Sequence, residues 1–321
     1  MTPVRVMVTG GAGFIGSHLI ERLLASGIEV DVVDDLSSGS LSNLATARSM
    51  RGGKLHFHQI DVKDAGVATL VERRKPEIVF HLAARSDVRM SMVDPMGDAD
   101  VNILGSLRIL DASRRFGVQK VIFAASAGVY GFVPEDSMPI VEDVAHRPES
   151  NYGISKDTVL KYLEVYRSNY DLEYTALILA NVYGPRQGAR GEAGVVSVFA
   201  RSLLEGRPTT IFGDGTQTRD FIYVDDVVDA FWRAMDAGDG TQLNIGTGDE
   251  ISINDLYHKL TVVTGREGTL PIYAQGVTGE IKRSVLNARR AGWYLRWHPF
   301  TKLGDGLRSV VSWMEAEASA E

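Results

Sequence analysis

The sequence predicts an α/β fold with a doubly wound parallel sheet and a smaller, discontinuous C-terminal lobe. Two observations predict the sheet. Short apolar runs alternate with amphipathic stretches through the first 180 residues, and these runs are continuously apolar. Such runs are typical of parallel strands that helices cover on both faces. The third observation predicts the lobe: after residue 181, glycine and proline become more frequent and the elements shorten.

The predicted elements of the first half follow one another in a β-α-β rhythm. Apolar runs predict strands at 4–8, 28–33, 54–60, 77–82 and 120–124. Helical spacing of apolar residues predicts helices at 14–25, 67–74, 101–116 and 151–170. Because the helices recur regularly between the strands, the pattern favours a parallel sheet over an antiparallel α+β arrangement.

The second half divides between the sheet and the lobe. A strand is expected at 172–179, and two later segments are expected to return to the sheet: a strand and helix within 220–236 and a short strand at 243–245. The predicted nucleotide-binding domain therefore comprises residues 1–180 with about 218–247. The predicted substrate-binding lobe comprises about 181–217 with 248–321.

Charge and composition exclude several classes of function. The 321 residues carry 34 Lys and Arg against 41 Asp and Glu, a net charge of −7, which disfavours binding to nucleic acid or anionic membranes. The absence of cysteine excludes disulfides, thiol nucleophiles and cysteine-ligated metals. The sequence contains no His-Glu-x-x-His motif, so no metal site is expected. No apolar segment approaches the roughly 20 residues of a membrane span, and no signal peptide is expected. We therefore expect a cytoplasmic protein.

A glycine-rich turn joins the first predicted strand to the first helix. Within Thr9–Ser17, Gly11, Gly13 and Gly16 satisfy G-x-G-x-x-G in the strand-to-helix context that this motif requires. Such a turn lets the backbone approach a pyrophosphate, whose oxygens then face the free N–H groups of the helix. A Walker A loop is excluded, because Ser and His follow the last glycine where Lys and Ser or Thr are required.

A carboxylate ends the second predicted strand. Asp34 lies where a ribose-binding acid is expected, and no arginine follows it closely. A carboxylate there accepts a hydrogen bond from the adenosine 2′-hydroxyl and repels a 2′-phosphate, which favours NAD over NADP. Asp61, just past the third strand, is placed either to contact adenine or to form a plain turn. These positions predict a Rossmann-type dinucleotide site.

A tyrosine and a lysine four residues apart on the long helix indicate proton transfer. Tyr152 and Lys156 lie on one helical face. A phenol has a pKa near 10, so it is a poor base at neutral pH unless a nearby ammonium stabilises the phenolate. Such a tyrosine exchanges a proton with a sugar hydroxyl while a hydride moves to or from nicotinamide. Ser126, just beyond the fifth strand, is placed to bridge the substrate oxygen and the tyrosine, or else to form a turn.

The combination resembles the extended short-chain dehydrogenase/reductase family, and within it the UDP-sugar 4-epimerases. The resemblance covers nearly the whole chain, and its matching pieces are Thr9–Ser17, Asp34, Asp61-Val62, His81–Ala84, Asn102, Ser126 with 129–131, Tyr152 with Lys156, 181–187 and 219–221. It implies NAD-dependent epimerisation at carbon 4 of a UDP-sugar of the UDP-glucose/UDP-galactose type, through a transient 4-keto sugar. In this scheme Ser126, Tyr152 and Lys156 carry catalysis.

The same resemblance implies the contacts of both ligands. The implied cofactor contacts are Gly10, Gly11, Gly13, Phe14, Ile15, Gly16, Asp34, Ser38, Gly39, Asp61, Val62, Leu82, Ala83, Ala84, Asn102, Ala124, Tyr152 and Lys156. The expected substrate contacts are Ser126, Tyr152, Asn181, Arg186, Arg190, Val195, Val196, Phe199, Arg219 and Arg283. Asn181 and Arg219 are expected at the diphosphate.

Departures from the family pattern leave the sugar open. Val277 stands where a diphosphate-binding arginine is common, and Arg283 is a hypothetical substitute. Arg186 or Arg190 is placed to receive a carbon-6 carboxylate, which makes UDP-glucuronate an alternative substrate. A small Ser284 is compatible with an N-acetyl group at carbon 2, or is simply a small residue in a turn.

Two further classes of function are weighed against epimerisation. Ala127 and Gly128 cannot act as acids, which argues against a nucleotide-sugar dehydratase. A net oxidoreductase or lyase would depend on free NAD, whereas an epimerase retains its cofactor. A non-catalytic NAD(H)-binding regulator does not need the proton-transfer set. By analogy with the family, we expect a homodimer formed through the 101–116 and 151–170 helices, with outer apolar residues at Leu160, Leu163 and Tyr166.

Overall fold

The protein is described by a computed structural model over residues 5–188, 194–276 and 281–320. Within these residues, seven strands form a large sheet, every pairing of which is parallel. In spatial order the strands are β10 (Thr241–Ile245), β6 (Glu173–Leu179), β5 (Lys120–Ser126), β4 (Ile78–His81), β1 (Arg5–Thr9), β2 (Glu29–Asp34) and β3 (Leu55–Gln59). The predicted doubly wound parallel sheet is confirmed.

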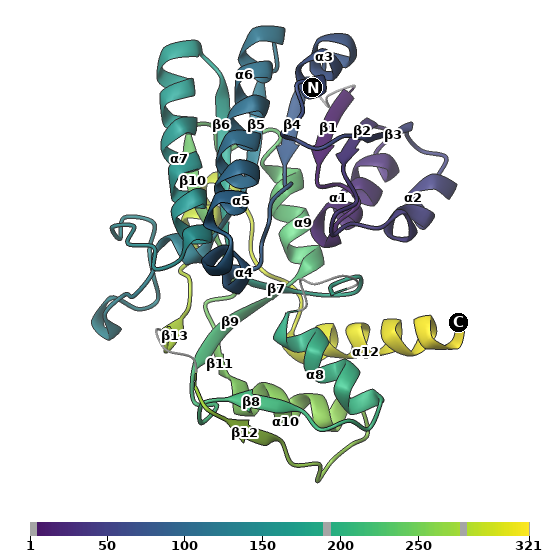
Figure 1. The fold of residues 1–321 in the computed structure, drawn as a ribbon, viewed down its shortest axis with the longest axis vertical. Helices are drawn as coiled ribbons and strands as arrows, with labels where there is room; N and C mark the ends of the chain where they lie inside the picture. The colour runs from purple at the N-terminus through teal and green to yellow at the C-terminus, as the bar shows by residue number, and fades with distance from the viewer. Residues whose placement is uncertain (1–4, 189–193, 277–280, 321) are drawn as a thin grey trace.

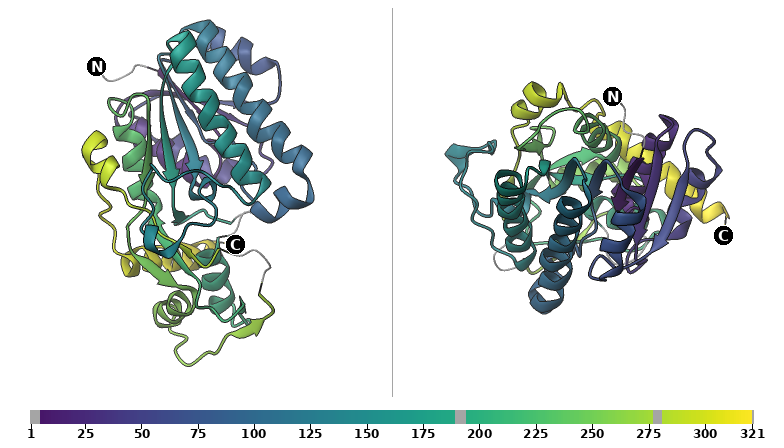
Figure 2. Two further views of the ribbon diagram at one scale, coloured as in Figure 1. Left: turned by 90° about the vertical axis from the view of Figure 1, so that its left-hand side faces the viewer. Right: turned by 90° about the horizontal axis from the view of Figure 1, so that it is seen from above.

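Helices cover both faces of this sheet (Figures 1 and 2). Those packed around it are α1 (Phe14–Ala25), α2 (Ala45–Ser49), α3 (Gly66–Arg74), α6 (Ser106–Phe116), α7 (Asn151–Tyr170), α9 (Val224–Arg233) and α11 (Arg289–Leu295). α3, α6 and α7 pack side by side on one face, and α1 packs against α9 on the other. Successive residues of β1 enter different cores: Val6 and Val8 join one hydrophobic cluster and Met7 the other. Burial on both faces explains the continuously apolar strands.

The helix predicted at 101–116 is one part of a longer, interrupted run. The run comprises α4 (Val88–Val93), α5 (Pro95–Ala99), a π-helical segment (Asp100–Gly105) and α6. Pro95 ends α4 because proline cannot supply the N–H that a continuing helix requires. The Asp94 side chain then accepts a 3.0 Å hydrogen bond from the Gly97 N–H and restarts the helix as its N-cap.

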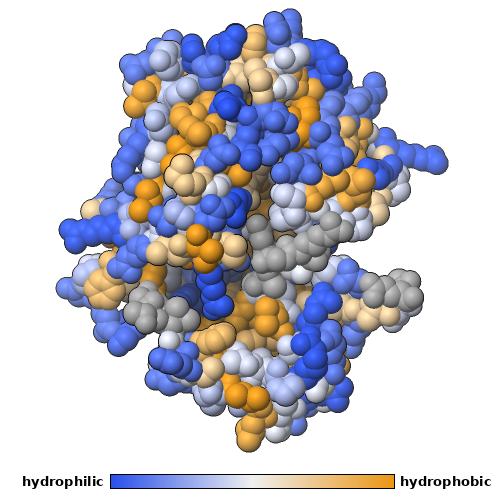
Figure 3. All heavy atoms as spheres, viewed as in Figure 1, coloured by the Kyte–Doolittle hydropathy of each residue, from blue (hydrophilic) through white to orange (hydrophobic). Residues whose placement is uncertain are grey.

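A lobe with its own sheets lies below the large sheet in Figure 1, and a recess separates the two parts in Figure 3. Its strands are β7 (Asn181–Tyr183), β9 (Thr218–Tyr223), β11 (Glu250–Ser252) and β13 (Arg283–Ser284), with a separate pair β8 (Thr210–Phe212) and β12 (Ile272–Ala274). Its helices are α8 (Val195–Leu204), α10 (Ile253–Val263) and α12 (Leu303–Ala320). None of the helices in the described ranges has both the length and the apolar character needed to cross a membrane.

The structure corrects the expected course of the second half. The strand expected within 220–236 does not return to the large sheet, because β9 lies between β11 and β13 and also pairs with β7. β10 does return, beside β6. α11, which the sequence analysis places in the lobe, packs against β10 and α9. A local strand-then-helix pattern does not specify a partner strand, and here long-range pairings specify it.

Candidate active site

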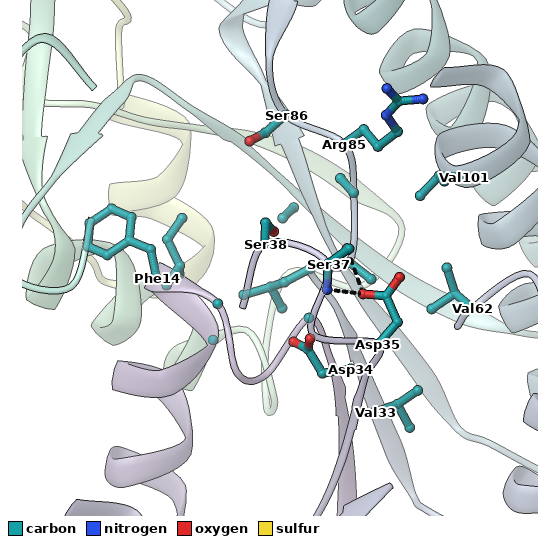
Figure 4. A pocket seen from close by; sticks show the side chains of 18 of the residues that line it. Phe14, Val33, Asp34, Asp35, Ser37, Ser38, Val62, Arg85, Ser86 and Val101 are labelled. Carbon is teal, nitrogen blue, oxygen red and sulfur yellow. Dashed lines mark hydrogen bonds between the residues drawn. The ribbon is translucent and has the colours of Figure 1, made fainter. Parts of the chain in front are cut away.

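A cavity of about 640 Å³ opens where β1, β4 and β5 end. Its lining includes Gly10 after β1, Leu82 after β4 and Ala124 in β5. The chain reverses its order across the sheet at this point, because β1 lies between β2 and β4. Open α/β sheets bind ligands at such switch points, outside the carboxyl ends of the strands. Figure 4 shows the cavity between Phe14 on one side and Arg85 and Val101 on the other.

The glycine-rich turn forms one end of the cavity, and two of its glycines are sterically required. Gly10 has a left-handed φ of 69°, and a Cβ there would lie 2.7 Å from the Ala83 nitrogen. A Cβ on Gly16 would lie 2.3 Å from the Gly10 carbonyl oxygen. The turn therefore brings bare backbone and the first turn of α1 to the cavity. This is the arrangement that binds a pyrophosphate at a helix N-terminus.

Asp34 closes the same end of the cavity. Its two carboxylate oxygens accept hydrogen bonds from the Ala12 N–H at 2.9 Å and the Leu36 N–H at 2.8 Å. Burial raises the pKa of Asp34, although these two bonds oppose the shift. Beside it, Asp35 accepts hydrogen bonds from both the N–H and the hydroxyl of Ser37, as Figure 4 shows. The Asp34 carboxylate is thus held by two backbone N–H groups at the cavity wall, where the sequence predicts the ribose.

The proposed proton-transfer pair also lines the cavity. Lys156, itself buried, donates a 2.8 Å hydrogen bond from Nζ to the Ala124 carbonyl, and its Nζ lies 5.7 Å from the centre of the Tyr152 ring. The start of α7 is tied to α4, because the Tyr152 N–H donates to Ser91 Oγ at 3.1 Å and Asn151 donates to the Ser91 carbonyl at 2.9 Å. Both side chains therefore reach the cavity from a helix that is anchored near its N-terminus.

Ser126 stands at the end of β5, half-buried, next to two residues that line the cavity, Ala124 and Ala125. Its Oγ accepts a 3.2 Å hydrogen bond from the Gly128 N–H and begins a 3-10 turn. The predicted position of Ser126 at the end of the strand is therefore confirmed. Ser126 also begins a turn, as the alternative interpretation expects. Its contact with substrate stays a prediction.

The structure brings most of the expected cofactor residues to this one cavity. Those that line it are Gly10, Gly13, Phe14, Ile15, Gly16, Asp34, Ser38, Asp61, Val62, Leu82, Ala83, Ala84, Ala124, Tyr152 and Lys156. Gly11 and Gly39 instead pack against the protein: a Cβ on Gly11 would lie 2.7 Å from Val32, and one on Gly39 would lie 2.9 Å from Asp34.

Asn102 lies behind the cavity wall rather than in it. It is 2% exposed, its Oδ1 accepts a hydrogen bond from the Arg85 N–H at 2.9 Å, and its Nδ2 donates to the Arg85 carbonyl and to Asp98. Both polar ends of the amide are thus committed to protein partners. In the structure the side chain thus holds the wall, and the expected contact of Asn102 with the cofactor stays a prediction.

The expected substrate residues are dispersed. Asn181 is exposed at the start of β7, and its neighbour in register, Phe221, belongs to the same β9 as Arg219. One Arg219 guanidinium nitrogen donates to the Thr218 carbonyl at 2.8 Å. Val195 is half-buried at the start of α8. Arg190 and Val277 lie outside the described residues.

Four of the expected substrate residues have partners within the protein, and their contacts with the substrate stay predictions. Arg186, which lines the cavity, pairs with Glu21 at 2.6 Å and lies over the first turn of α1. Arg283 pairs with Glu250 at 2.5 Å. Val196 and Phe199 are 1% and 3% exposed within the core that α8, α10 and α12 share, so they cannot line an open site as the structure stands. Periodicity on α8 places them on an apolar face but does not say what covers that face.

Several cavity residues escape sequence reasoning. They are Val33, Asp35, Ser37, Asn43, Ile60, Lys63, Arg85, Ser86, Asp94, Gly97, Val101, Ala125, Leu179, Val182, Gln187 and Gly188. Most directly follow or precede expected residues at strand ends, so the strand-end rule could have included them. Asp94, Gly97 and Val101 carry no such signal, because the interrupted helix brings them there.

Sequence reasoning also missed a contact between the helical run beside the large sheet and the lobe: the Arg89 guanidinium lies 5.2 Å from the centre of the Phe212 ring.

Comparison with known proteins places this site in a family. Residues 6–246 match the model of the NAD dependent epimerase/dehydratase family. A UDP-glucose 4-epimerase of Mycolicibacterium smegmatis is 45% identical over 312 residues, which cover 96% of this chain and 97% of the relative. The crystal structure of a Thermotoga maritima UDP-glucose 4-epimerase with UDP-glucose has a TM-score of 0.93 and 40% identity, covering 98% of this chain and 99% of that one. A Thermus thermophilus UDP-glucose 4-epimerase in complex with NAD has a TM-score of 0.89 and 38% identity, with coverages of 97% and 99%. The chain therefore belongs to the NAD dependent epimerase/dehydratase family.

Proposed function

We propose that the protein is an NAD-dependent UDP-sugar 4-epimerase that interconverts UDP-glucose and UDP-galactose. One observation carries the proposal: Tyr152 and Lys156 line the same cavity as the glycine turn and Asp34. Proton-transfer groups and a dinucleotide cradle thus share one space. The similarity to UDP-glucose 4-epimerases over nearly the full chain supports this choice of reaction and of sugar.

The residues of the cavity fit NAD. Gly10 and Gly16 let the turn pack closely on itself and on the end of β4, because a Cβ on either would collide with backbone, and this close turn is the one that presents backbone N–H groups to a pyrophosphate. Asp34 presents a carboxylate for the ribose hydroxyls and opposes a 2′-phosphate. NAD, when bound, would supply the hydride acceptor for carbon 4 and the hydride donor for the 4-keto sugar.

The chain supplies the proton chemistry. The Tyr152 phenolate takes the proton of the carbon-4 hydroxyl and, as the phenol, later gives it back. The Lys156 ammonium, held by the Ala124 carbonyl, favours the phenolate during this exchange. Ser126 donates to the sugar oxygen and keeps it in line with Tyr152.

On the lobe side, Asn181 and Arg219 bind the diphosphate, for which an arginine offers bidentate, charge-assisted bonds. The 4-keto sugar turns over between the two hydride transfers.

The alternative sugars are less well supported by the described contacts. Receipt of a glucuronate carboxylate by Arg186 requires that this arginine leave Glu21 and Ser17. Ser284 is adjacent to Arg219 in the β9–β13 register. Its small side chain is compatible with an N-acetyl group, so a UDP-N-acetyl sugar is included as a substrate in the test. Dehydration remains disfavoured, because Ala127 and Gly128 carry no acid.

The test is turnover without added cofactor. Purified protein is incubated in deuterated water, separately with UDP-glucose, UDP-glucuronate and UDP-N-acetylglucosamine, and proton NMR follows each sugar. UDP-galactose without deuterium at carbon 4 is expected, because hydride returns from retained NAD. Tyr152→Phe is expected to abolish this conversion while NAD remains bound. A keto or unsaturated product, or full turnover by Tyr152→Phe, contradicts the proposal, and turnover of another sugar alone reassigns the substrate.

We further propose a cytoplasmic homodimer, in which α6 and α7 of two copies pack together. The outer stripe of α7 carries Ile154, Tyr162 and Val165, which are 48%, 37% and 46% exposed. Leu160 and Leu163, expected on this face, are instead 1% exposed in the core beneath it. Their burial follows from the packing of α7 on β5 and β6. Sedimentation of the protein is expected to give twice the 35.0 kDa chain mass.

A further inference from the structure

A buried carboxylate lies behind the cavity, on the helical run that precedes α6. Asp98, in α5, is 1% exposed. Its Oδ2 accepts a 2.6 Å hydrogen bond from the Ser155 hydroxyl, and its Oδ1 accepts a 2.9 Å hydrogen bond from Asn102 Nδ2. Both donors, a hydroxyl and an amide, are uncharged groups. A buried, hydrogen-bonded polar group contributes little stability compared with apolar packing of the same volume, which points to a role in geometry.

One end of this link reaches the catalytic helix. Ser155, 2% exposed, lies on α7 between Tyr152 and Lys156, immediately before the lysine. Its bond to Asp98 therefore attaches to α5 the single helical turn that carries both proton-transfer side chains. Ser91 attaches the beginning of the same turn to α4 through the Tyr152 N–H. The turn is thus held from two neighbouring helices.

The other end reaches the wall of the cofactor cavity. Asn102, on the π-helical segment, clamps the backbone of Arg85 by accepting from its N–H and donating to its carbonyl. Arg85 and its neighbours 82–84 line the cavity. π-helical turns within α-helical runs occur frequently at functional sites. Here the wider turn coincides with the residue that joins Asp98 to the cavity wall.

We propose that Asp98 is a positioning residue for the epimerase reaction. Through Ser155 and Asn102 it sets the distance between the proton-transfer turn of α7 and the cavity wall formed by residues 82–85. The inference rests on the proposed function, because it concerns the alignment of carbon 4 between Tyr152 and the cofactor. Displacement of reacting groups by about 1 Å can lower a rate about 100-fold while binding is maintained.

The experiment compares four variants of the full-length protein. Asp98→Ala removes both hydrogen bonds, and Ser155→Ala removes one. Asp98→Asn retains the shape, since its amide can accept from Asn102 and donate to Ser155 Oγ. Asp157→Ala is the matched control: Asp157 is 6% exposed on the same helix, next to Lys156, but it bonds to His146 and Lys161 on another side. Thermal stability, retained NAD, kcat and KM are measured for each.

Asp98→Ala is expected to lower kcat about 10- to 100-fold while KM for UDP-glucose changes less than about 3-fold. Ser155→Ala is expected to show a smaller kcat loss of the same kind, and it decides the matter if Asp98→Ala does not fold. Asp98→Asn is expected to recover most of kcat. Asp157→Ala is expected to lose stability while kcat stays unchanged.

The proposal is overturned if Asp98→Ala or Ser155→Ala keeps the wild-type kcat, or if Asp157→Ala loses kcat to the same extent as Asp98→Ala. It is also overturned if Asp98→Asn is as slow as Asp98→Ala. Failure of the proposed function is distinguishable, because the wild-type protein would then not produce a carbon-4 epimer. The absorbance of enzyme-bound NADH formed on mixing with UDP-sugar reports the first hydride transfer and separates alignment from later steps.

Discussion

Thr9 and His81, at the adjacent ends of β1 and β4, share a 2.7 Å hydrogen bond in complete burial. The Thr9 hydroxyl oxygen accepts from the Ala83 N–H, so its proton goes to His81 Nδ1. The Ser106 hydroxyl donates to the Asn102 carbonyl, so its oxygen receives the proton of His81 Nε2. The network thereby assigns a neutral Nε2–H tautomer. It joins the strand ends of the switch point to the segment that supports the cavity wall.

Protonation of this histidine is predicted to oppose folding. Burial, with a smaller contribution from the Lys156 ammonium, lowers the pKa of His81 from 6.5 to about 3. Below pH 6.5 the unfolded chain therefore binds a proton that the native state refuses, so the free energy of unfolding falls as the pH falls towards 3. For one such group the loss between pH 7.5 and pH 5 is about 2 kcal/mol.

Urea unfolding at several pH values checks this contribution. His81→Gln keeps an acceptor and a donor but cannot titrate, so its loss of stability between pH 7.5 and pH 5 is expected to be about 2 kcal/mol smaller than in the wild type. The exposed His298 supplies a control, because His298→Gln should retain the wild-type dependence. Parallel curves for wild type and His81→Gln would contradict the assignment.

Gly16→Ala is predicted to destroy cofactor binding. The added Cβ would lie 2.3 Å from the Gly10 carbonyl oxygen and 2.7 Å from Gly11 Cα, both of which are backbone atoms in the turn. We expect loss of bound NAD and a destabilisation of at least about 2 kcal/mol. Gly66→Ala is the matched helical control, because nothing lies within 4 Å of its Cβ. Absorbance of NAD released on denaturation measures the first effect. Normal NAD content in Gly16→Ala would show that the turn relaxes.

Asp34→Asn is predicted to weaken NAD binding and to reduce discrimination against NADP. The substituted amide has only one oxygen for the Ala12 and Leu36 N–H groups, so one of them faces an NH₂ group. An unsatisfied buried donor costs about 1–3 kcal/mol of stability in the turn, and the neutral amide offers the ribose hydroxyl a weaker, uncharged hydrogen bond and no longer repels a 2′-phosphate. Titration of cofactor-free protein with both dinucleotides checks the ratio. Asp35→Asn, altered at the exposed neighbouring carboxylate, should show a smaller change.

Arg219→Ala is predicted to raise KM for UDP-glucose about 10- to 100-fold and to change kcat little, since a charge-assisted bond to the diphosphate contributes about 1.5–3 kcal/mol. Arg283→Ala is expected to have a smaller effect, because Arg283 is already paired with Glu250. Steady-state kinetics on both variants gives the comparison. A larger KM change for Arg283→Ala would reverse the assignment of the diphosphate clamp.

Motifs tied to strand ends could be placed from sequence because a parallel sheet fixes where such ends lie. Once Val6 and Val8 are assigned to a strand, the turn at Gly10 must emerge at its carboxyl edge, together with Leu82 and Ala124. Residues whose position depends on a second element could not be placed. Phe199 was expected at the ligand and lies in the core, because α10 and α12 cover its face of α8.

The sequence by itself determined the parallel sheet, the glycine turn and the spacing of Tyr152 and Lys156, because periodicity and local sterics act within one element or between consecutive ones. Only the tertiary structure decided that β9 joins the lobe, that Arg186 pairs with Glu21, and that Asn102 turns away from the cavity towards Asp98. Each of these depends on a partner distant in the chain. A polar side chain bonds to whichever group the fold presents, and one-dimensional patterns do not contain that choice.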